Sequence, residues 1–124
     1  MDIETVTADI LAWSENFVEV PHPALGGWPP CPFARQARLN RTMQVLTGAD
    51  PYFDLRNRAR WGMGQYEVIV YAYDPAEWPY SRFHSSIESA NREFLLARDI
   101  LALEDHPSDV EDVNGVIMNQ GKYA

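Results

Sequence analysis

The side chain with the clearest chemical potential in this sequence is the thiol of Cys31, the single cysteine of the chain. It lies in the stretch GGWPPCPFARQARL, directly before a segment that can be helical with Pro32 as its first residue. A thiol at a helix N-terminus close to arginines has a stabilised thiolate, and His22, in the same loop, would complete a minimal Cys/His pair. Cysteine is also among the most buried residue types. Cys31 is therefore either a nucleophile assisted by His22 or a small packing residue, and we favour packing.

A second chemical feature is a cluster of arginines in an acidic chain. Six of the ten basic residues fall between positions 35 and 60, where only two acidic residues stand, so this segment has a net charge of +4 and the rest of the chain −12. These arginines are Arg35, Arg38, Arg41, Arg56, Arg58 and Arg60. Together with Trp28 they have the composition of a site for a small anionic or aromatic molecule or for a protein partner. The competing interpretation is that the arginines pair with acidic side chains on neighbouring helices.

Composition limits the class of protein. The 124 residues, 46% hydrophobic and 23% charged, are enough for one core, so we predict one domain over residues 1–124. The net charge of −8 argues against binding to nucleic acid or to an anionic membrane surface, and no apolar run has the ~20 residues of a membrane span. A single cysteine cannot form an internal disulfide, which suits a reducing compartment, and the acidic first residues are unlike a signal peptide. We therefore expect a cytoplasmic protein.

The sequence contains no compact motif for a metal or a cofactor. Cys31 and the three histidines, His22, His84 and His106, include donor atoms that zinc prefers, but their spacing is not that of a zinc motif. The acidic stretch LEDHPSDVEDVNG lacks the ligand spacing of an EF-hand, and no glycine-rich phosphate loop is present. We predict neither a metal nor a cofactor.

The periodicity of apolar residues predicts the elements that position these side chains. The expected elements are helices over residues 5–18, 32–41 and 80–101 and strands over residues 43–48, 66–74 and 115–124, with most of residues 49–64 as a loop. Thr5 or Thr7 would cap the first helix. Trp28 and Leu25 would pin the proline-rich loop to the core. In the second helix, Phe33 and Leu39 would face inward.

The order of these elements indicates the fold class. A strand, a long helix and a strand in succession predict a βαβ unit in the C-terminal half, with the last strand parallel to strand 66–74. The fold is then α+β, a single-domain sandwich for which a ferredoxin-like arrangement is one solution. Because a terminal strand leaves an edge open for pairing, we also expect a homodimer through that edge.

The segment Cys31-Pro32-Phe33-Ala34 is similar to the active-site stretch of omega-class glutathione transferases and glutaredoxins. This resemblance implies a thioredoxin-like domain in which Cys31 forms a mixed disulfide with glutathione. That fold places a β-strand directly before the cysteine, whereas here a helix and then five prolines within residues 21–32 stand there, so we interpret the similarity as local. Trp13 and Val18 in the first helix, followed by the same four residues, also resemble a group of small bacterial domains, and no activity comes with that resemblance.

Two functional hypotheses follow. In the first, which we favour, the protein is a non-catalytic accessory domain whose proline-rich Cys31 loop and segment 35–60 contact an anionic or aromatic ligand or a partner. In the second, it is a small thiol-dependent enzyme with Cys31 as the nucleophile, assisted by His22 or Arg35. The first is favoured because no base, orienting group and oxyanion donor can be assigned together from the sequence.

Overall fold

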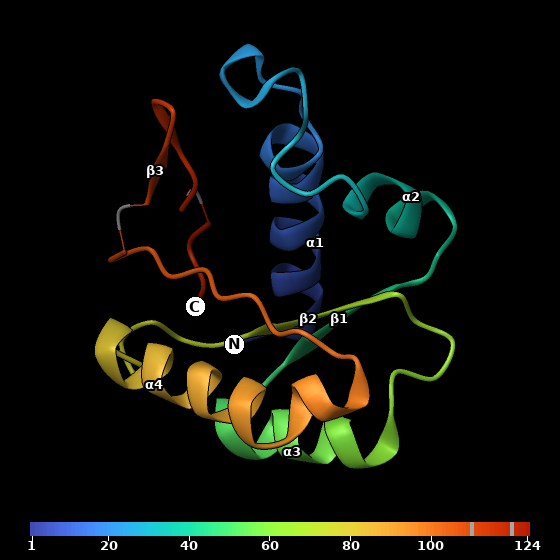
Figure 1. The fold of residues 1–124 in the computed structure, drawn as a ribbon, viewed down its shortest axis with the longest axis vertical. Helices are drawn as coiled ribbons and strands as arrows, with labels where there is room; N and C mark the ends of the chain where they lie inside the picture. Colours follow the sequence, from blue (N-terminus) through green and yellow to red (C-terminus); the bar gives the residue numbers. More distant parts are fainter. Residues whose placement is uncertain (110, 120) are drawn as a thin grey trace.

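Two parallel strands lie at the centre of the molecule in the computed structural model, which describes residues 1–109, 111–119 and 121–124 (Figure 1). β1 (Met43–Thr47) pairs with β2 (Val68–Ala72) in the register that places Met43 opposite Val68. Both strands lie within the ranges predicted for them. Their β-branched and aromatic residues favour the extended backbone, which explains why the sequence signal is strong.

Helix α3 (Pro51–Trp61) connects β1 to β2, so these three elements form a βαβ unit in the middle of the chain. The prediction that most of residues 49–64 form a loop is wrong. The side chain of Asp50 caps the helix by accepting a hydrogen bond from the Phe53 N–H (3.2 Å), and Pro51 occupies the first helical position, where its missing N–H costs nothing. The Asp-Pro pair that suggests a turn is therefore the start of a helix.

Helix α1 (Ile3–Trp13) covers one face of the strand pair (Figure 1). It continues into a π-helical segment, Ser14–Val18, so the helix predicted over residues 5–18 is confirmed. Its cap is Asp2, which accepts a hydrogen bond from the Thr5 N–H, and neither Thr5 nor Thr7 has that role. The apolar contacts between α1 and the strands involve Val6, Ile10, Val45, Val70 and Ala72.

The other face of the strand pair is covered by α3 and by α4 (Tyr80–Ala90) (Figure 1). α4 continues as a π-helical turn, Asn91–Leu95, and a 3₁₀ turn, Leu96–Arg98, and ends at Asp99, whose φ of 56° is left-handed. The helix predicted over residues 80–101 is thus confirmed except for its last residues. The buried residues on this side include Leu55, Ala59, Tyr73, Phe83, Ile87, Ala90 and Leu95.

A proline-rich loop with one 3₁₀ turn (Pro23–Leu25) connects the first helix to α2 (Ala34–Leu39), a short helix. α2 begins later than predicted, with Phe33 as its cap residue. The prediction that Phe33 and Leu39 face the core is wrong, because both are exposed. The buried residues of α2 are Ala34 and Ala37. These small side chains let the helix lie close to the segment that ends the first helix.

The C-terminal residues form an antiparallel hairpin of β3 (Asp112–Val113) and β4 (Val116–Ile117). The turn between them lies at Asn114-Gly115, as predicted. The last strand is not parallel to β2, so the placement of the βαβ unit in the C-terminal half is wrong. The chain instead reaches the end of β2 through Ala124, which exchanges two backbone hydrogen bonds with Tyr73 (2.9 and 3.1 Å).

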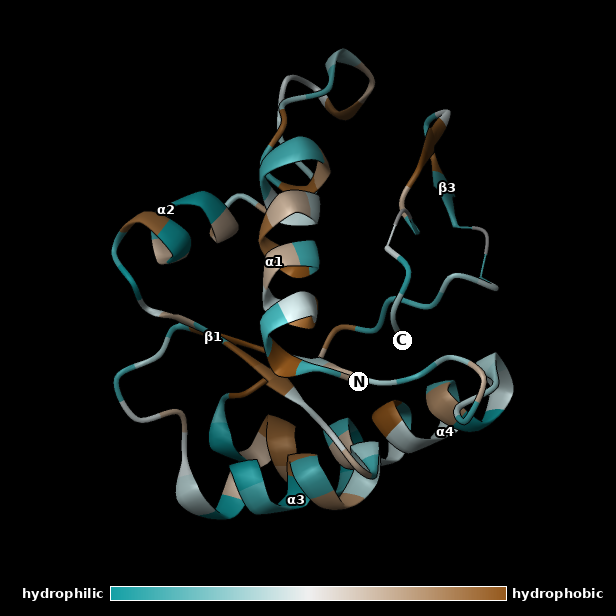
Figure 2. Ribbon diagram, turned by 180° about the vertical axis from the view of Figure 1, so that it is seen from behind, coloured by the Kyte–Doolittle hydropathy of each residue, from teal (hydrophilic) through white to brown (hydrophobic). Residues whose placement is uncertain are grey.

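These elements make a small α+β domain, as predicted. A ferredoxin-like arrangement is not confirmed, since the described strands form one parallel pair and one separate hairpin. Figure 2 shows the hydrophobic residues of β1 between α1 on one side and α3 on the other. No helix in the described part of the chain is long and apolar enough to cross a bilayer.

Candidate functional site

The loop between α1 and α2 is held in one conformation by its own backbone. The His22 N–H donates to the Trp28 carbonyl (3.1 Å), and the Gly27 N–H donates to the His22 carbonyl (3.0 Å). Gly26 and Gly27 have φ values of 69° and 81°, a left-handed conformation that favours glycine and closes the turn. Five prolines restrict the rest of the backbone. The loop is therefore pre-organised although it lacks regular structure.

Trp28, at the end of this turn, is not a core residue. It is 65% exposed, so the prediction that it pins the loop to the core is wrong, and Leu25 is only half-buried. Phe33, at the start of α2, is 74% exposed. Exposed aromatic side chains on a rigid loop are typical of a contact surface, because they bring a large apolar area to a partner.

Cys31 is half-buried, and its backbone ties the loop to the helices. Its N–H donates to the Val18 carbonyl (3.1 Å), and its carbonyl accepts from the Ala34 N–H (3.4 Å). α2 starts at Ala34, so Cys31 is not at the helix N-terminus that the sequence predicts. Within the described residues, the Cys31 thiol makes no hydrogen bond. The effect of the helix dipole on Cys31 that the sequence suggests therefore has no helix N-terminus at this residue.

His22 lies in the same loop but is not hydrogen-bonded to Cys31. Its ring packs on Phe17, with 5.6 Å between centroids, and its Nε2 atom is buried without a hydrogen-bond partner among residues 1–109, 111–119 and 121–124. A general base must lie within hydrogen-bond reach of the proton that it takes. That geometry is not present between these two side chains.

Arg38 has a structural role. Its guanidinium donates two hydrogen bonds of 2.9 Å to the Glu19 carboxylate and forms a 3.0 Å ion pair with Glu15. Glu19 is almost fully buried and also accepts from the Ser14 hydroxyl. The hydrogen bonds from Arg38 lower the pKa of Glu19 against the opposing effect of burial, and the same pair raises the pKa of Arg38. This contact fixes α2 against the end of the first helix.

The other arginines are divided between two sides of the strand pair. Arg58 donates to the Tyr71 hydroxyl (2.9 Å), and the Arg56 guanidinium lies 4.9 Å from the centroid of the Phe53 ring. Both belong to α3, which lies on the opposite side of the strands from α2 (Figure 1). The predicted site residues on or next to α2 are Arg35, Arg38 and Arg41, and those on α3 are Arg56, Arg58 and Arg60. The structure does not gather the two groups into one site.

The outer side of α2 is the part of this region that is open to a ligand. Arg35 and Leu39 are exposed and one helical turn apart, away from the buried alanines, and Arg41 follows with a φ of 58°. Neither arginine forms an ion pair with a residue that the structure describes. We use the name Trp28 face for the exposed residues of the loop and of α2 taken together, which are Trp28, Phe33, Arg35, Leu39 and Arg41.

A groove between α1 and the last residues of the chain contains polar groups that sequence reasoning misses. Asp9 accepts from the Lys122 Nζ (2.8 Å) and the Tyr123 hydroxyl (2.6 Å). The Trp13 Nε1 is buried there without a hydrogen-bond partner in the described part of the chain. A water oxygen is a suitable acceptor for the hydrogen bond of this indole N–H. Asp9 and Tyr123 are 114 positions apart, so no local signal in the sequence indicates this groove.

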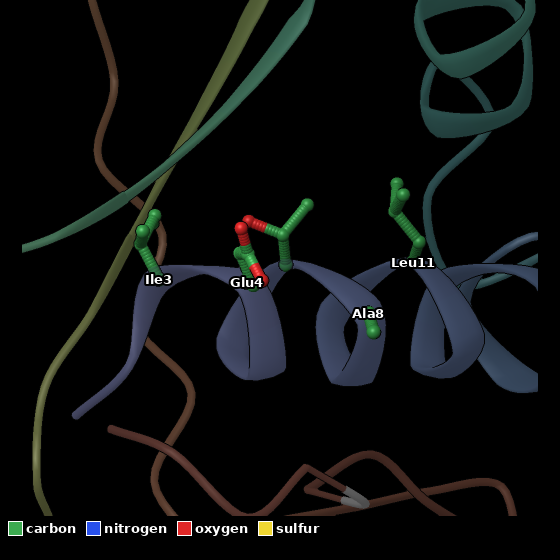
Figure 3. A pocket seen from close by; sticks show the side chains of 5 residues that line it. Ile3, Glu4, Ala8 and Leu11 are labelled. Carbon is green, nitrogen blue, oxygen red and sulfur yellow. The ribbon is translucent and has the colours of Figure 1, made fainter.

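A shallow depression lies on α1, where Ile3 and Leu11 point to the same side of the helix (Figure 3). Its lining is apolar apart from Glu4 and Thr7. Among the described residues that line it, none supplies a buried polar atom that would orient a ligand.

The histidines near α4 have structural contacts. His106 is buried, with its Nε2 at 2.7 Å from the Trp78 carbonyl and its Nδ1 at 3.1 Å from the Ser108 N–H, which places the ring proton on Nε2. His84 contacts Glu104 at 2.6 Å, and this hydrogen bond raises the pKa of His84. No three His, Cys, Asp or Glu side chains within the described ranges are arranged to hold a metal ion.

No family model, no curated protein and no solved structure matches this chain. Unlike the groove and the depression, the Trp28 face combines large exposed aromatic side chains with arginines that form no ion pair among the described residues, and it adds to them a loop restricted by its own hydrogen bonds.

Proposed function

We propose that this protein is a non-catalytic binding domain whose Trp28 face holds an acidic segment of a protein partner that also carries apolar side chains. The observation that carries this proposal is the exposure of Trp28 on a pre-organised loop and of Phe33 at the start of α2, the helix that is followed by Arg41 and contains Arg35. Tryptophan and arginine are among the residue types that contribute most to the affinity of protein interfaces.

The rigidity of the loop supports a binding role. A flexible loop loses conformational entropy on association, whereas the hydrogen bonds between His22 and Trp28 and the neighbouring prolines already restrict this one. The contact between Arg38 and Glu19 holds α2 beside it in the same way. The aromatic side chains are thus presented before the partner arrives.

Charge determines which partner the face favours. The net charge of −8 repels acidic chains from much of the surface, whereas Arg35 and Arg41 supply positive charge on the Trp28 face, as the exposed Arg56 and Arg60 do on α3. Complementary charges steer association and fix its orientation more than they set its final strength. A segment with carboxylates next to leucine or aromatic residues therefore fits the face in both charge and apolar character.

The competing hypothesis, a thiol-dependent enzyme, has less support. The Cys31 thiol has no hydrogen-bonded base within the described residues, and the helix that would stabilise its thiolate starts at Ala34. Nucleophilic catalysis needs an activated thiol with a base in reach. We therefore interpret Cys31 as a packing residue of the loop.

The proposal predicts the composition and the affinity of bound peptides. Peptides selected on the immobilised protein from a random display library should contain acidic residues next to leucine or aromatic residues. Their affinity, measured by the anisotropy of a fluorescein label, should fall about tenfold or more in the Trp28→Ser and Phe33→Ser variants, as expected for interface hot spots. An Arg35→Gln/Arg41→Gln variant should bind more weakly and with less dependence on salt.

Two further variants control this experiment. Trp61→Ser is the matched control, because Trp61 is 71% exposed but belongs to α3 on the other side of the strand pair, and it should bind normally. Cys31→Ser separates the two hypotheses, since a binding domain keeps its affinity without the thiol. Selected peptides without acidic residues, or an affinity that survives both aromatic substitutions, would contradict the proposal.

A further inference from the structure

The segment that follows α4 is an extended chain with two exposed leucines. Ile100 and Ala102 are partly buried and pack against the core. Leu101 and Leu103, which alternate with them, are 61% and 82% exposed. An alternation of buried and exposed residues is typical of a strand with one buried face. The solvent-facing positions of such a strand normally carry polar residues, but here they carry leucine.

Side chains from α4 and from the π-helical turn after it hold this segment in place. The Asn91 amide donates to the Ala102 carbonyl (2.9 Å) and accepts from the Ala102 N–H (2.8 Å), which fixes the backbone between the two leucines. His84 contacts Glu104 at 2.6 Å, directly after Leu103. The leucines are therefore presented by an anchored backbone, and their exposure does not result from fraying.

The same part of the chain carries a high density of negative charge. Residues 99–112 contain six acidic residues and neither lysine nor arginine. The acidic residues are Asp99, Glu104, Asp105, Asp109, Glu111 and Asp112. Residues 99–104 thus combine exposed leucines with carboxylates on both sides of them.

We infer that the occupant of the Trp28 face is the segment 99–104 of a second copy of this chain, an inference that rests on the proposed function of that face. Leu101 and Leu103 of one copy would pack on Trp28 and Phe33 of the other. Asp99, at one end of the segment, has the charge that the arginines of the face attract, and the carboxylate of Glu104, at the other end, already contacts His84. The chain would then associate with itself through two different surfaces.

The placement of the two surfaces favours association between copies. Among the described residues, no hydrogen bond or ion pair joins segment 99–104 to the Trp28 face within one molecule, so both surfaces stay open in the monomer. Two copies with a net charge of −8 each repel at long range, but this repulsion is screened beyond ~8 Å at physiological ionic strength. The local contact between opposite charges then decides whether the copies associate.

Sedimentation velocity over a range of protein concentrations tests this inference. The wild type should show concentration-dependent association. A Leu101→Ser/Leu103→Ser variant and a Trp28→Ser/Phe33→Ser variant should each remain monomeric, and far-UV circular dichroism should show that both stay folded, since all four side chains are exposed. Trp61→Ser, on the opposite side of the strands, should associate like the wild type.

A mixture of the two monomeric variants provides the decisive measurement. One variant retains an intact Trp28 face and the other an intact leucine segment, so an equimolar mixture should form mixed dimers although neither variant associates alone. A wild type that is monomeric at every concentration, or association that both double variants retain, would overturn the inference. Peptide binding to the Trp28 face by a strictly monomeric wild type would overturn this inference alone. A wild type that neither binds peptides nor associates with itself would overturn the proposed function as well.

Discussion

At the scale of single residues, Gly48 shows how closely the end of β1 is packed. A Cβ atom at this position would overlap the Tyr73 ring and lie 2.6 Å from the Asp54 Oδ2. The Tyr73 hydroxyl donates to that carboxylate (2.8 Å), and burial, reinforced by this bond, raises the pKa of Tyr73 far above its ordinary value. Tyr73 therefore stays a donor, and the space beside Gly48 is occupied by a buried hydrogen bond.

A Gly48→Ala substitution should destabilise the protein because the methyl group must displace this pair. We expect a loss of about 1–3 kcal/mol in the free energy of unfolding, as for other overpacked sites, measured by urea denaturation. Ala49→Ser, at the exposed next position, should change stability by less than ~0.5 kcal/mol. Equal stability of the two variants would show that Tyr73 and Asp54 can move apart freely.

The roles of single residues could be predicted only in part. The sequence identifies Trp28 and the arginines as candidates by their type, but it assigns Trp28 to the core, because loop tryptophans usually pack. It also cannot tell Arg35 from Arg38, since the difference is a contact of Arg38 with Glu19, nineteen residues away in the chain. Exposure and pairing depend on tertiary contacts that no local pattern encodes.

At the scale of elements, His84 connects α4 to the extended segment that follows it. Its ring contacts Glu104 at 2.6 Å and Glu88 at 3.2 Å, lies near Asp109, and stacks on Tyr80. The hydrogen bond with Glu104 is the main cause of the raised pKa of His84. The charged imidazolium therefore stabilises the fold fully below its ordinary pKa of 6.5, and this contribution is lost as the pH rises through the higher folded-state value.

A His84→Gln variant should reveal this contribution by its pH dependence. The Tm of the wild type should exceed that of the variant more at about pH 6 than at about pH 9, both above the range in which carboxyl groups titrate. The difference should be small, because exposed ion pairs contribute only ~0.2–1 kcal/mol. A Tm difference that does not change between these pH values would argue against an ion-pair role for His84.

Elements with strong periodicity are predicted well, and those with ambiguous boundary signals are not. α1, α4, β1 and β2 follow from their apolar patterns. α3 is missed, because Asp50-Pro51 is a turn signal as well as a helix start and the sequence of α3 is rich in arginine. The inward-facing residues of α2 are missed because alanines fill its buried side, and the apolar Phe33 and Leu39 lie outside.

At the scale of the whole molecule, the fold class could be predicted and the topology could not. A strand, a helix and a strand in succession suggest a parallel crossover, but this pattern does not determine which two strands of the chain pair with each other. β2 pairs with the strand before it, and residues 112–117 form a hairpin of their own. Strand pairing is decided by non-local packing, here by the helices on both faces of β1 and β2.

The contiguous βαβ unit has a consequence for the order of folding. Met43 and Val68, the first partners of the parallel pair, are only 25 residues apart. The contacts of the two chain ends span more of the sequence, because Val6 of α1 packs near Val45 and Val70. Ala124, at the other end of the chain, pairs with Tyr73. Because short loops close at lower entropic cost, the central unit should form first and the two chain ends should dock later.

If folding follows this order, native contacts in the transition state are formed more in the central βαβ unit than in α1. Leu55→Ala, in the central unit, should slow folding, whereas Val6→Ala, in α1, should mainly accelerate unfolding when chevron plots of both variants are compared. A larger φ-value for Val6 than for Leu55 would mean that α1 nucleates the fold. In the expected case, the helix next to the proline-rich loop docks after the folding barrier, and the Trp28 face is completed in the last steps of folding.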